Sequence, residues 1–213
     1  RWLKSGNAWN SATEIGAPIF EGQAYAYATT DQDRLVGKAK FASFPSYFRA
    51  FVTDSAPGAI VENNNIGTLG GNSSEACDMK DESGAVGWAH NSYGRKRAFY
   101  LQVGATALQW FNELPPLPGV TPGASQPYNS EAFSVNRYGD VSGYAQNSSG
   151  QDRAFQFNPA NGGSMIDLTA TYAGSSGWIL QRAVAINDGG ILVGSGTFGG
   201  VFSLWTLYRK CQE

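Results

Sequence analysis

Residues 183–194 read AVAINDGGILVG, and the same twelve-residue pattern occurs as AYATTDQDRLVG at 26–37, ACDMKDESGAVG at 76–87 and AFSVNRYGDVSG at 132–143. Each copy begins with alanine and ends with glycine. The copies start 50, 56 and 51 residues apart (76 − 26, 132 − 76 and 183 − 132), which is typical of propeller blades or solenoid coils. The pattern therefore indicates an internal repeat of four units.

The middle of each copy favours a turn between two short strands. The fourth copy has Asn-Asp-Gly at 187–189 and the third has Asn-Arg-Tyr-Gly at 136–139, residues that tolerate positive φ or form side-chain turns. The first two copies have polar residues at 30–33 and 80–83. All four copies therefore predict a strand, a turn and a second strand.

Two further strands are predicted after each hairpin. The third strand begins with Arg-Ala-Phe at 49–51, 97–99 and 153–155, and with Gly-Val-Phe at 200–202. The fourth ends in Asn-Ile-Gly at 65–67, Glu-Leu-Pro at 113–115 and Ile-Asp-Leu at 166–168, and the last unit lacks it. Residues 13–16, Thr-Glu-Ile-Gly, have the same form, and Trp2 stands where a third strand would finish. Sixteen strands are therefore expected, four of each type.

The two ends of the chain thus supply complementary parts of one unit. Radial closure is one way to protect exposed sheet edges. We therefore expect an all-β fold, a four-bladed β-propeller with four-stranded blades of about 50 residues, in which the N-terminal strand closes the last blade. Residues 1–213 form one domain, with units 26–75, 76–131, 132–182, and 183–213 plus 1–25. The alternatives are an open β-solenoid and a polymer in which the N-terminal strand is exchanged between chains.

A further motif links the repeat to a known family. Residues 66–71 read Ile-Gly-Thr-Leu-Gly-Gly, and residues 183–194 carry Ile-Asn followed by Val-Gly. From about Ala24 to Trp205 the chain resembles the bacterial extracellular HAF repeats, whose unit contains Ile-Asn, His-Ala-Phe and Leu-Gly-Thr-Leu-Gly-Gly. The family histidine is replaced by arginine in three units and by Gly200 in the fourth. The resemblance implies a secreted, cell-surface or matrix location and no established catalytic residues.

Composition supports the all-β prediction and excludes several partners. The chain has 27 glycines, 9 prolines and 15% charged residues, which suits short strands and tight turns better than helices. The longest loops are expected at 112–127 and 169–177. A net charge of −2 and a pI near 5.5 argue against nucleic acid, and no apolar run is long enough to span a membrane. Because the chain begins with Arg1, we expect that a signal peptide has been removed.

Catalytic patterns are sparse. His90 is the only histidine, and no Gly-x-Ser-x-Gly motif accompanies it. Asp31, Asp33, Asp81 and Glu82 lie in equivalent turns, where they could flank a glycosidic bond or bind structural calcium, but no calcium-loop spacing is present. We therefore expect no enzyme, no cofactor and no metal site, and rank a glycan-active enzyme third among the functions.

The remaining candidate residues are aromatic, cysteine and asparagine side chains. Trp88 and Tyr144 follow the last glycine of their repeats, and with His90 they are the candidate ligand-binding residues. The two cysteines, Cys77 and Cys211, are the candidate pair for a disulfide. N-glycosylation sequons begin at Asn72 and Asn147.

Two functions follow from this reading. The first is a non-catalytic extracellular structural or interaction module, whose partners are itself or other surface and matrix proteins. The second is a carbohydrate-binding propeller with glycan partners, which would combine weak repeated pockets through multivalency.

Overall fold

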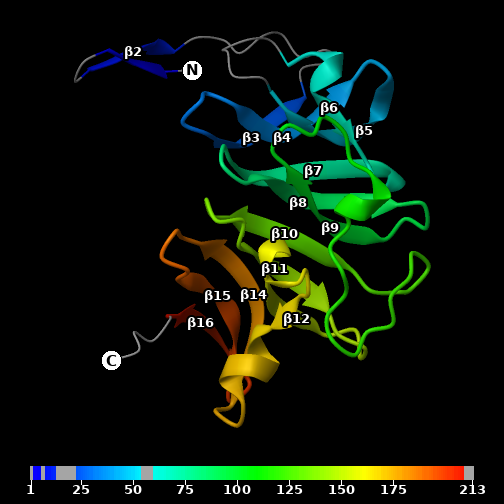
Figure 1. Ribbon diagram of the computed structural model, residues 1–213, viewed down its shortest axis with the longest axis vertical. Coiled ribbons are helices and arrows are strands. Elements are labelled where there is room, and N and C mark those ends of the chain that lie inside the picture. Colours follow the sequence, from blue (N-terminus) through cyan, green and yellow to red (C-terminus); the bar gives the residue numbers. More distant parts are fainter. Residues whose placement is uncertain (1, 6–7, 13–22, 54–59, 209–213) are drawn as a thin grey trace.

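The computed structural model describes residues 2–5, 8–12, 23–53 and 60–208, and it shows an all-β protein with four antiparallel sheets of three or four strands and a separate two-stranded hairpin (Figure 1). Sheet 1 contains β3 (Ala24–Thr29), β4 (Leu35–Phe41), β5 (Phe44–Val52) and β6 (Asn65–Gly67). Sheet 2 contains β7 (Gly70–Lys80), β8 (Gly84–Asn91) and β9 (Lys96–Gln102). Sheet 3 contains β10 (Ser130–Val135), β11 (Val141–Gln146), β12 (Asp152–Phe157) and β13 (Ile166–Asp167). Sheet 4 contains β14 (Trp178–Ile186), β15 (Leu192–Phe198) and β16 (Val201–Leu207).

The repeated phrase forms the first two strands of every sheet, as predicted. Its alanine pairs with its final glycine in all four copies, and a β-bulge follows the alanine each time. A Cβ atom at this glycine would lie 1.8–2.0 Å from the carbonyl oxygen of the residue before the alanine. The bulge therefore brings the two strands so close that only glycine fits, which explains the fixed spacing.

The third strands confirm three predictions and correct the fourth. Phe51, Phe99 and Phe155 each pair with the final glycine of the phrase. In sheet 4 that partner is Trp205, so the counterpart of Arg-Ala-Phe is Ser-Leu-Trp at 203–205 and not the predicted Gly-Val-Phe at 200–202. The tryptophan ring fills the space beside Gly194. Phe202 lies three residues earlier on the same strand, where it pairs with Thr197.

The outer strands differ between the sheets. Strands β6 and β13 pair with β5 and β12, whereas Glu113 makes only one bridge, to Phe99. In sheet 4, β16 is the outermost strand. The predicted fourth strand at 13–16 lies outside the described residues, and Trp2 belongs to β1 (Trp2–Ser5), which pairs with β2 (Ala8–Ala12) in a separate N-terminal hairpin.

Sheets 1, 2 and 3 follow one another along the long axis, and sheet 4 lies beside sheet 3 (Figure 1). Buried apolar side chains join sheets 1 and 2, sheets 2 and 3, and sheets 3 and 4. The first alanine of the later phrase lies in each of these cores and is fully buried, as Ala76, Ala132 and Ala183. The N-terminal hairpin lies next to sheet 1 at the upper left, and sheet 4 lies at the lower left (Figure 1). Within the described residues, sheet 4 shares no strand with the hairpin or with sheet 1.

In residues 2–5, 8–12, 23–53 and 60–208, helical structure is confined to four short segments: η1 (Glu62–Asn64), η2 (Trp110–Asn112), η3 (Pro159–Asn161) and η4 (Thr169–Ala173). The segment 169–177, predicted as a loop, therefore begins with a helical turn, in which the Gly174 amide donates to the Thr169 carbonyl. In the part of the chain that the structure describes, no helix has the length and apolar character needed to cross a membrane.

Candidate functional site

One face of sheet 4 is open, although the same face is covered in the three other sheets. Val193 is 41% exposed, whereas its counterparts Val36 and Val86 are fully buried. Leu204 is 76% exposed, whereas the alanines that take its place in the other sheets, at 50, 98 and 154, are fully buried. The repeat thus places apolar residues where a following sheet would cover them, and in sheet 4 the described residues provide no such cover.

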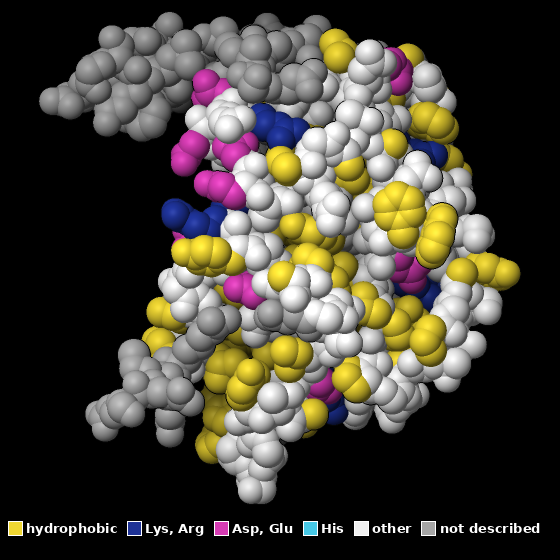
Figure 2. Space-filling view, viewed as in Figure 1, with side chains coloured by type: hydrophobic (Ala, Val, Ile, Leu, Met, Phe, Trp, Pro, Cys, Tyr) yellow, Lys and Arg dark blue, Asp and Glu magenta, His cyan; other side chains and the backbone are white. Residues whose placement is uncertain are grey.

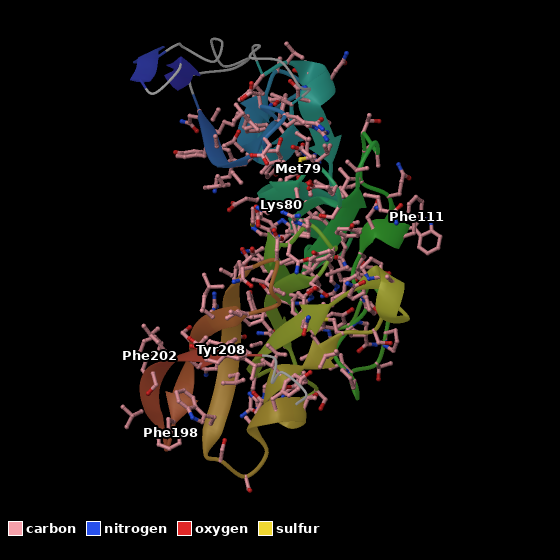
Figure 3. All side chains as sticks on the ribbon, turned by 60° about the vertical axis from the view of Figure 1, so that its left-hand side comes forward. Met79, Lys80, Phe111, Phe198, Phe202 and Tyr208 are labelled. Atoms are coloured by element: carbon pink, nitrogen blue, oxygen red, sulfur yellow. The ribbon has the colours of Figure 1, made fainter. Side chains whose placement is uncertain are left out.

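We call this open surface the terminal face and define it by Ile179, Val193, Phe202 and Leu204. Strand pairing places these four side chains on one side of the sheet, together with Ser195, Thr197 and Thr206. Phe202 is 70% exposed. Hydrophobic side chains gather over sheet 4 at the lower left of Figure 2, and Phe198 and Phe202 project outward from it in Figure 3. Exposed apolar surface of this kind is a common feature of interaction sites.

A groove follows β16 beside the terminal face. Its volume is about 380 Å³, and it is lined by Leu204, Trp205, Thr206 and Leu207 on one side and by residues of β14 and the η4 segment on the other. Since successive strand residues point to opposite faces, a groove that touches four in a row includes the edge of the strand. In sheets 1 and 3 the counterparts of Trp205 pair with β6 and β13. The edge of β16, which forms one wall of the groove, therefore lies where a fourth strand pairs in those sheets, and the opposite wall belongs to the core between sheets 3 and 4.

Ion pairs cross each of the three internal interfaces between sheets. Lys38 Nζ lies 2.8 Å from Glu75 Oε2, and Lys96 Nζ lies 3.3 Å from Glu131 Oε2. At the third interface the signs are reversed: Arg182, on the later sheet, lies 3.2 Å from Asp152 Oδ2. On the terminal face the counterparts of Lys38 and Lys96 are Ser195 and Phe202. The terminal face is therefore uncharged at the positions that carry charge at the internal interfaces.

Burial and pairing shift the pKa values of these charged groups. Burial lowers the pKa of Lys38, but its hydrogen bond with Glu75 and further interactions outweigh this and raise the pKa to about 12. Burial raises the pKa of Glu131, although Lys96 opposes the shift. The ion pairs are thus partly removed from solvent.

The structure places two of the three candidate ligand-binding residues together. The rings of Trp88 and His90 lie 5.2 Å apart on β8, and Lys96 Nζ lies 4.1 Å from the Trp88 ring centroid. Burial, followed by the charge of Lys96, lowers the pKa of His90. Tyr144 lies at the next interface, where it is 8% exposed and Arg182 Cζ lies 4.4 Å from its ring centroid. The guanidinium group thus occupies a ring face that a sugar would need.

The cysteine and asparagine candidates lie on the first strand of sheet 2 and in a turn of sheet 3. Cys77, on β7, is a half-buried free thiol, and Cys211 lies outside the described residues. Burial raises the pKa of the Cys77 thiol. Asn72 is exposed on β7, whereas Asn147 uses its side-chain oxygen to accept hydrogen bonds from two backbone amides of its own turn.

The turns of all four repeats meet around a polar cavity of about 200 Å³. Their carboxylates bond to neighbouring turns: Asp81 Oδ2 accepts from the Gln32 amide at 3.0 Å, and Asp188 Oδ2 lies 2.9 Å from Arg137 Nε. The described residues contain no group of three His, Cys, Asp or Glu side chains arranged to hold a metal ion. These carboxylates therefore join adjacent turns.

Sequence reasoning missed the terminal face because it aligned Phe202 with the phenylalanines of the other units. A usable signal was present: the correct alignment puts Leu204 where three units have alanine, and so shows a larger apolar residue at a position that is otherwise small. The sequence also indicated an unpaired edge on β16, because the last unit lacks the motif of the fourth strand.

Known proteins assign no role to this surface. Comparisons of the chain with protein-family models, with curated proteins and with solved structures each gave no match. The candidate site is therefore defined by the internal repeat, which provides three covered examples of the face that sheet 4 leaves open.

Proposed function

We propose that this chain is an extracellular, non-catalytic structural and interaction module that associates through the terminal face of sheet 4. The single observation that carries the proposal is the contrast in burial between Leu204, which is 76% exposed, and the fully buried alanines in its place in the other sheets. Burying apolar surface is the main favourable term in protein association. The extracellular location is inferred from the resemblance to HAF repeats alone.

In this proposal the four sheets are blades of a propeller-like arrangement that is open between sheet 4 and sheet 1. Support comes from the repeat length, the four equivalent hairpins and the single direction in which each sheet covers the one before it. An open arrangement leaves one face and one strand edge exposed, and proteins generally cover such edges. Association through the terminal face provides that cover.

We expect the molar mass of the wild-type chain in solution to rise with concentration, and the substitution Leu204→Glu to abolish the rise. A carboxylate in an apolar interface must be desolvated without a partner, so the association constant should fall by on the order of 100-fold or more. Light scattering over a concentration series measures this effect. Because Leu204 is exposed, the fold of the monomer should be unaffected, which circular dichroism can check.

Phe111→Glu is the matched control. Phe111 is 66% exposed, similar to Leu204, but it lies on η2 on the opposite side of the molecule (Figure 3). The control should associate like the wild type. A wild-type chain that stays monomeric at every concentration, or loss of association in Phe111→Glu instead of Leu204→Glu, would contradict the proposal.

Carbohydrate binding is the second candidate, and one observation favours it. Trp110 and Phe111 form an exposed aromatic pair, 82% and 66% exposed, with ring centroids 5.8 Å apart. Such rings present large apolar surfaces to solvent at little conformational cost. Of the residues first considered for this role, Trp88 is half-buried and Tyr144 is buried, so the η2 pair is the more accessible platform.

A further inference from the structure

We propose that the partner of the terminal face is the N-terminal end of a second copy of this chain. In this assembly, strand β3 of the second copy covers the terminal face, and its N-terminal hairpin pairs with the outer edge of β16. The inference rests on the proposed function and identifies the surface that the terminal face binds.

The internal interfaces show what covers this face. In each, the first strand of the following sheet places its alanine against the preceding sheet: Ala76 packs with Val36 and Ala50 in one buried cluster. The corresponding alanine of sheet 1, Ala26, is exposed, as is most of β3. Within the described residues, β3 is thus a first strand that no other sheet covers, and the terminal face of sheet 4 is likewise covered by no other sheet. They are the two halves of a fourth interface of the same kind.

The order of elements along the chain agrees with this pairing. Inside the chain an outer fourth strand precedes the first strand of the next sheet: β6 is followed by β7, and β13 is followed, after η4, by β14. The N-terminal hairpin precedes β3 in the same way. If β3 of a second copy lies on the terminal face, its hairpin follows the path of a fourth strand along the groove beside Trp205 and Thr206.

The hairpin and the edge of β16 each lack pairing partners beyond their own sheet. In the described residues, β1 and β2 pair only with each other. A two-stranded hairpin is marginally stable in water, and it gains from packing or from a further strand. The outer edge of β16 offers backbone N–H and C=O groups to such a strand, which is the mode of β-strand addition.

The charges of the two surfaces match as well. At the internal interfaces, Glu75 or Glu131 on the incoming strand meets a lysine of the preceding sheet. The residue of β3 in their place is Tyr25, and the terminal face has Ser195 and Phe202 in place of the lysines. Both surfaces therefore have uncharged residues at the positions that form the ion pairs elsewhere. The new interface would bury no unpaired charge at these positions.

The assembly we propose joins different copies head to tail. In the described residues, the N-terminal hairpin and strand β3 share no sheet and no core cluster with sheet 4. An interface between two different surfaces is heterologous, and it continues from copy to copy unless the rotation between copies closes a ring. The chain would then form a linear or ring-shaped polymer.

Two one-sided variants test the geometry. Leu204→Glu blocks the terminal face and leaves the N-terminal end intact, whereas Ala26→Glu blocks the N-terminal end and leaves the terminal face intact. Each should be monomeric alone. An equimolar mixture should form a 1:1 heterodimer of twice the 22.7 kDa monomer mass and nothing larger, as measured by sedimentation velocity. Two glutamates are used so that the two blocked surfaces repel each other.

Ala160→Glu is the matched control for Ala26→Glu, because Ala160 is also an exposed alanine but lies on η3 of sheet 3. It should assemble like the wild type. For the hairpin, Trp9→Pro in the Leu204→Glu chain removes a backbone donor of β2 and should weaken the heterodimer at least tenfold. Unchanged affinity would overturn the part of the proposal that concerns the hairpin.

The remaining outcomes separate the two proposals. If Ala26→Glu still associates with itself while Leu204→Glu does not, the terminal face binds its own copy, so head-to-tail assembly is overturned and the proposed function stands. If both variants are monomeric and their mixture is monomeric too, head-to-tail assembly is likewise overturned. If the wild type is monomeric, the proposed function itself fails.

Discussion

Replacing Arg97 with alanine should lower the free energy of unfolding by about 3–5 kcal/mol, the usual loss when one partner of a buried ion pair is removed. The guanidinium group is fully buried, and its Nε lies 2.9 Å from Glu113 Oε1. It also donates to the carbonyl oxygens of Gln126 and Tyr128, so it holds the long loop that follows η2. Guanidinium-induced unfolding, followed by fluorescence, measures the change.

The control for this prediction is Arg153→Ala, at the same repeat position in sheet 3. Arg153 is half-buried, and its guanidinium donates to the Asp152 carbonyl and to the Gln151 side chain, both sequence neighbours. Its loss should cost less than about 1 kcal/mol. Equal losses for the two variants would show that Arg97 does not anchor the loop as described.

Gly143→Ala should destabilise the protein by about 3 kcal/mol, the upper part of the range for overpacking a close-packed site. The added Cβ would lie 2.0 Å from the Glu131 carbonyl oxygen and 2.8 Å from Phe155 Cε1. This steric clash can be relieved only if the bulge between β10 and β11 opens, because the nearer of these two atoms belongs to the backbone. The shift in thermal unfolding midpoint and the denaturant midpoint both report the loss.

Gly189→Ala provides the comparison. This glycine also belongs to a repeated phrase, but it lies in the exposed turn, and a Cβ there would meet only the Asn187 side-chain oxygen, at 3.3 Å. We expect a change within about 0.5 kcal/mol. Replacing glycine by alanine restricts the unfolded chain and by itself favours folding, so a similar loss at both glycines would contradict the assignment of the Gly143 loss to the close approach at the bulge.

The repeated hairpins could be predicted from the sequence because their cause is local. A bulge after Ala132 brings the backbone against Gly143, and turn residues lie at a fixed distance between them. The spacing of alanine and glycine therefore reports a contact that forms inside one hairpin. The same holds in all four units, which is why the four antiparallel hairpins and the all-β class were predicted correctly, whereas the predicted fourth strand is absent from the described part of sheets 2 and 4.

The third strand of sheet 4 could not be placed in the same way. Both Phe202 and Trp205 are aromatic residues that follow the fourth phrase, and the choice between them depends on which ring fits beside Gly194 in the folded sheet. The one that fits is buried, and the other is 70% exposed. Which of the two residues takes the place of the phenylalanine depends on the pairing register of β15 and β16, and the amino-acid sequence of the unit does not reveal this register.

Exposure of the aromatic candidates likewise depends on the neighbouring sheet. Tyr144 follows the glycine of its phrase as Trp88 does, but Arg182 of sheet 4 covers the Tyr144 ring. No pattern within the third unit indicates this cover, because it comes from a residue in the fourth. The terminal face is open for the corresponding reason: no described sheet follows sheet 4 to cover Val193 and Leu204.

Hydrogen exchange of backbone amides, compared between the assembled wild type and the monomeric Leu204→Glu variant, tests the central claim most directly. Pairing and burial protect amides from exchange. The account predicts slower exchange in the assembled protein at β16 and β3, with unchanged exchange around η2. Equal exchange of β16 in the two samples, or protection confined to the η2 segment, would contradict the claim that the terminal face is where this chain associates.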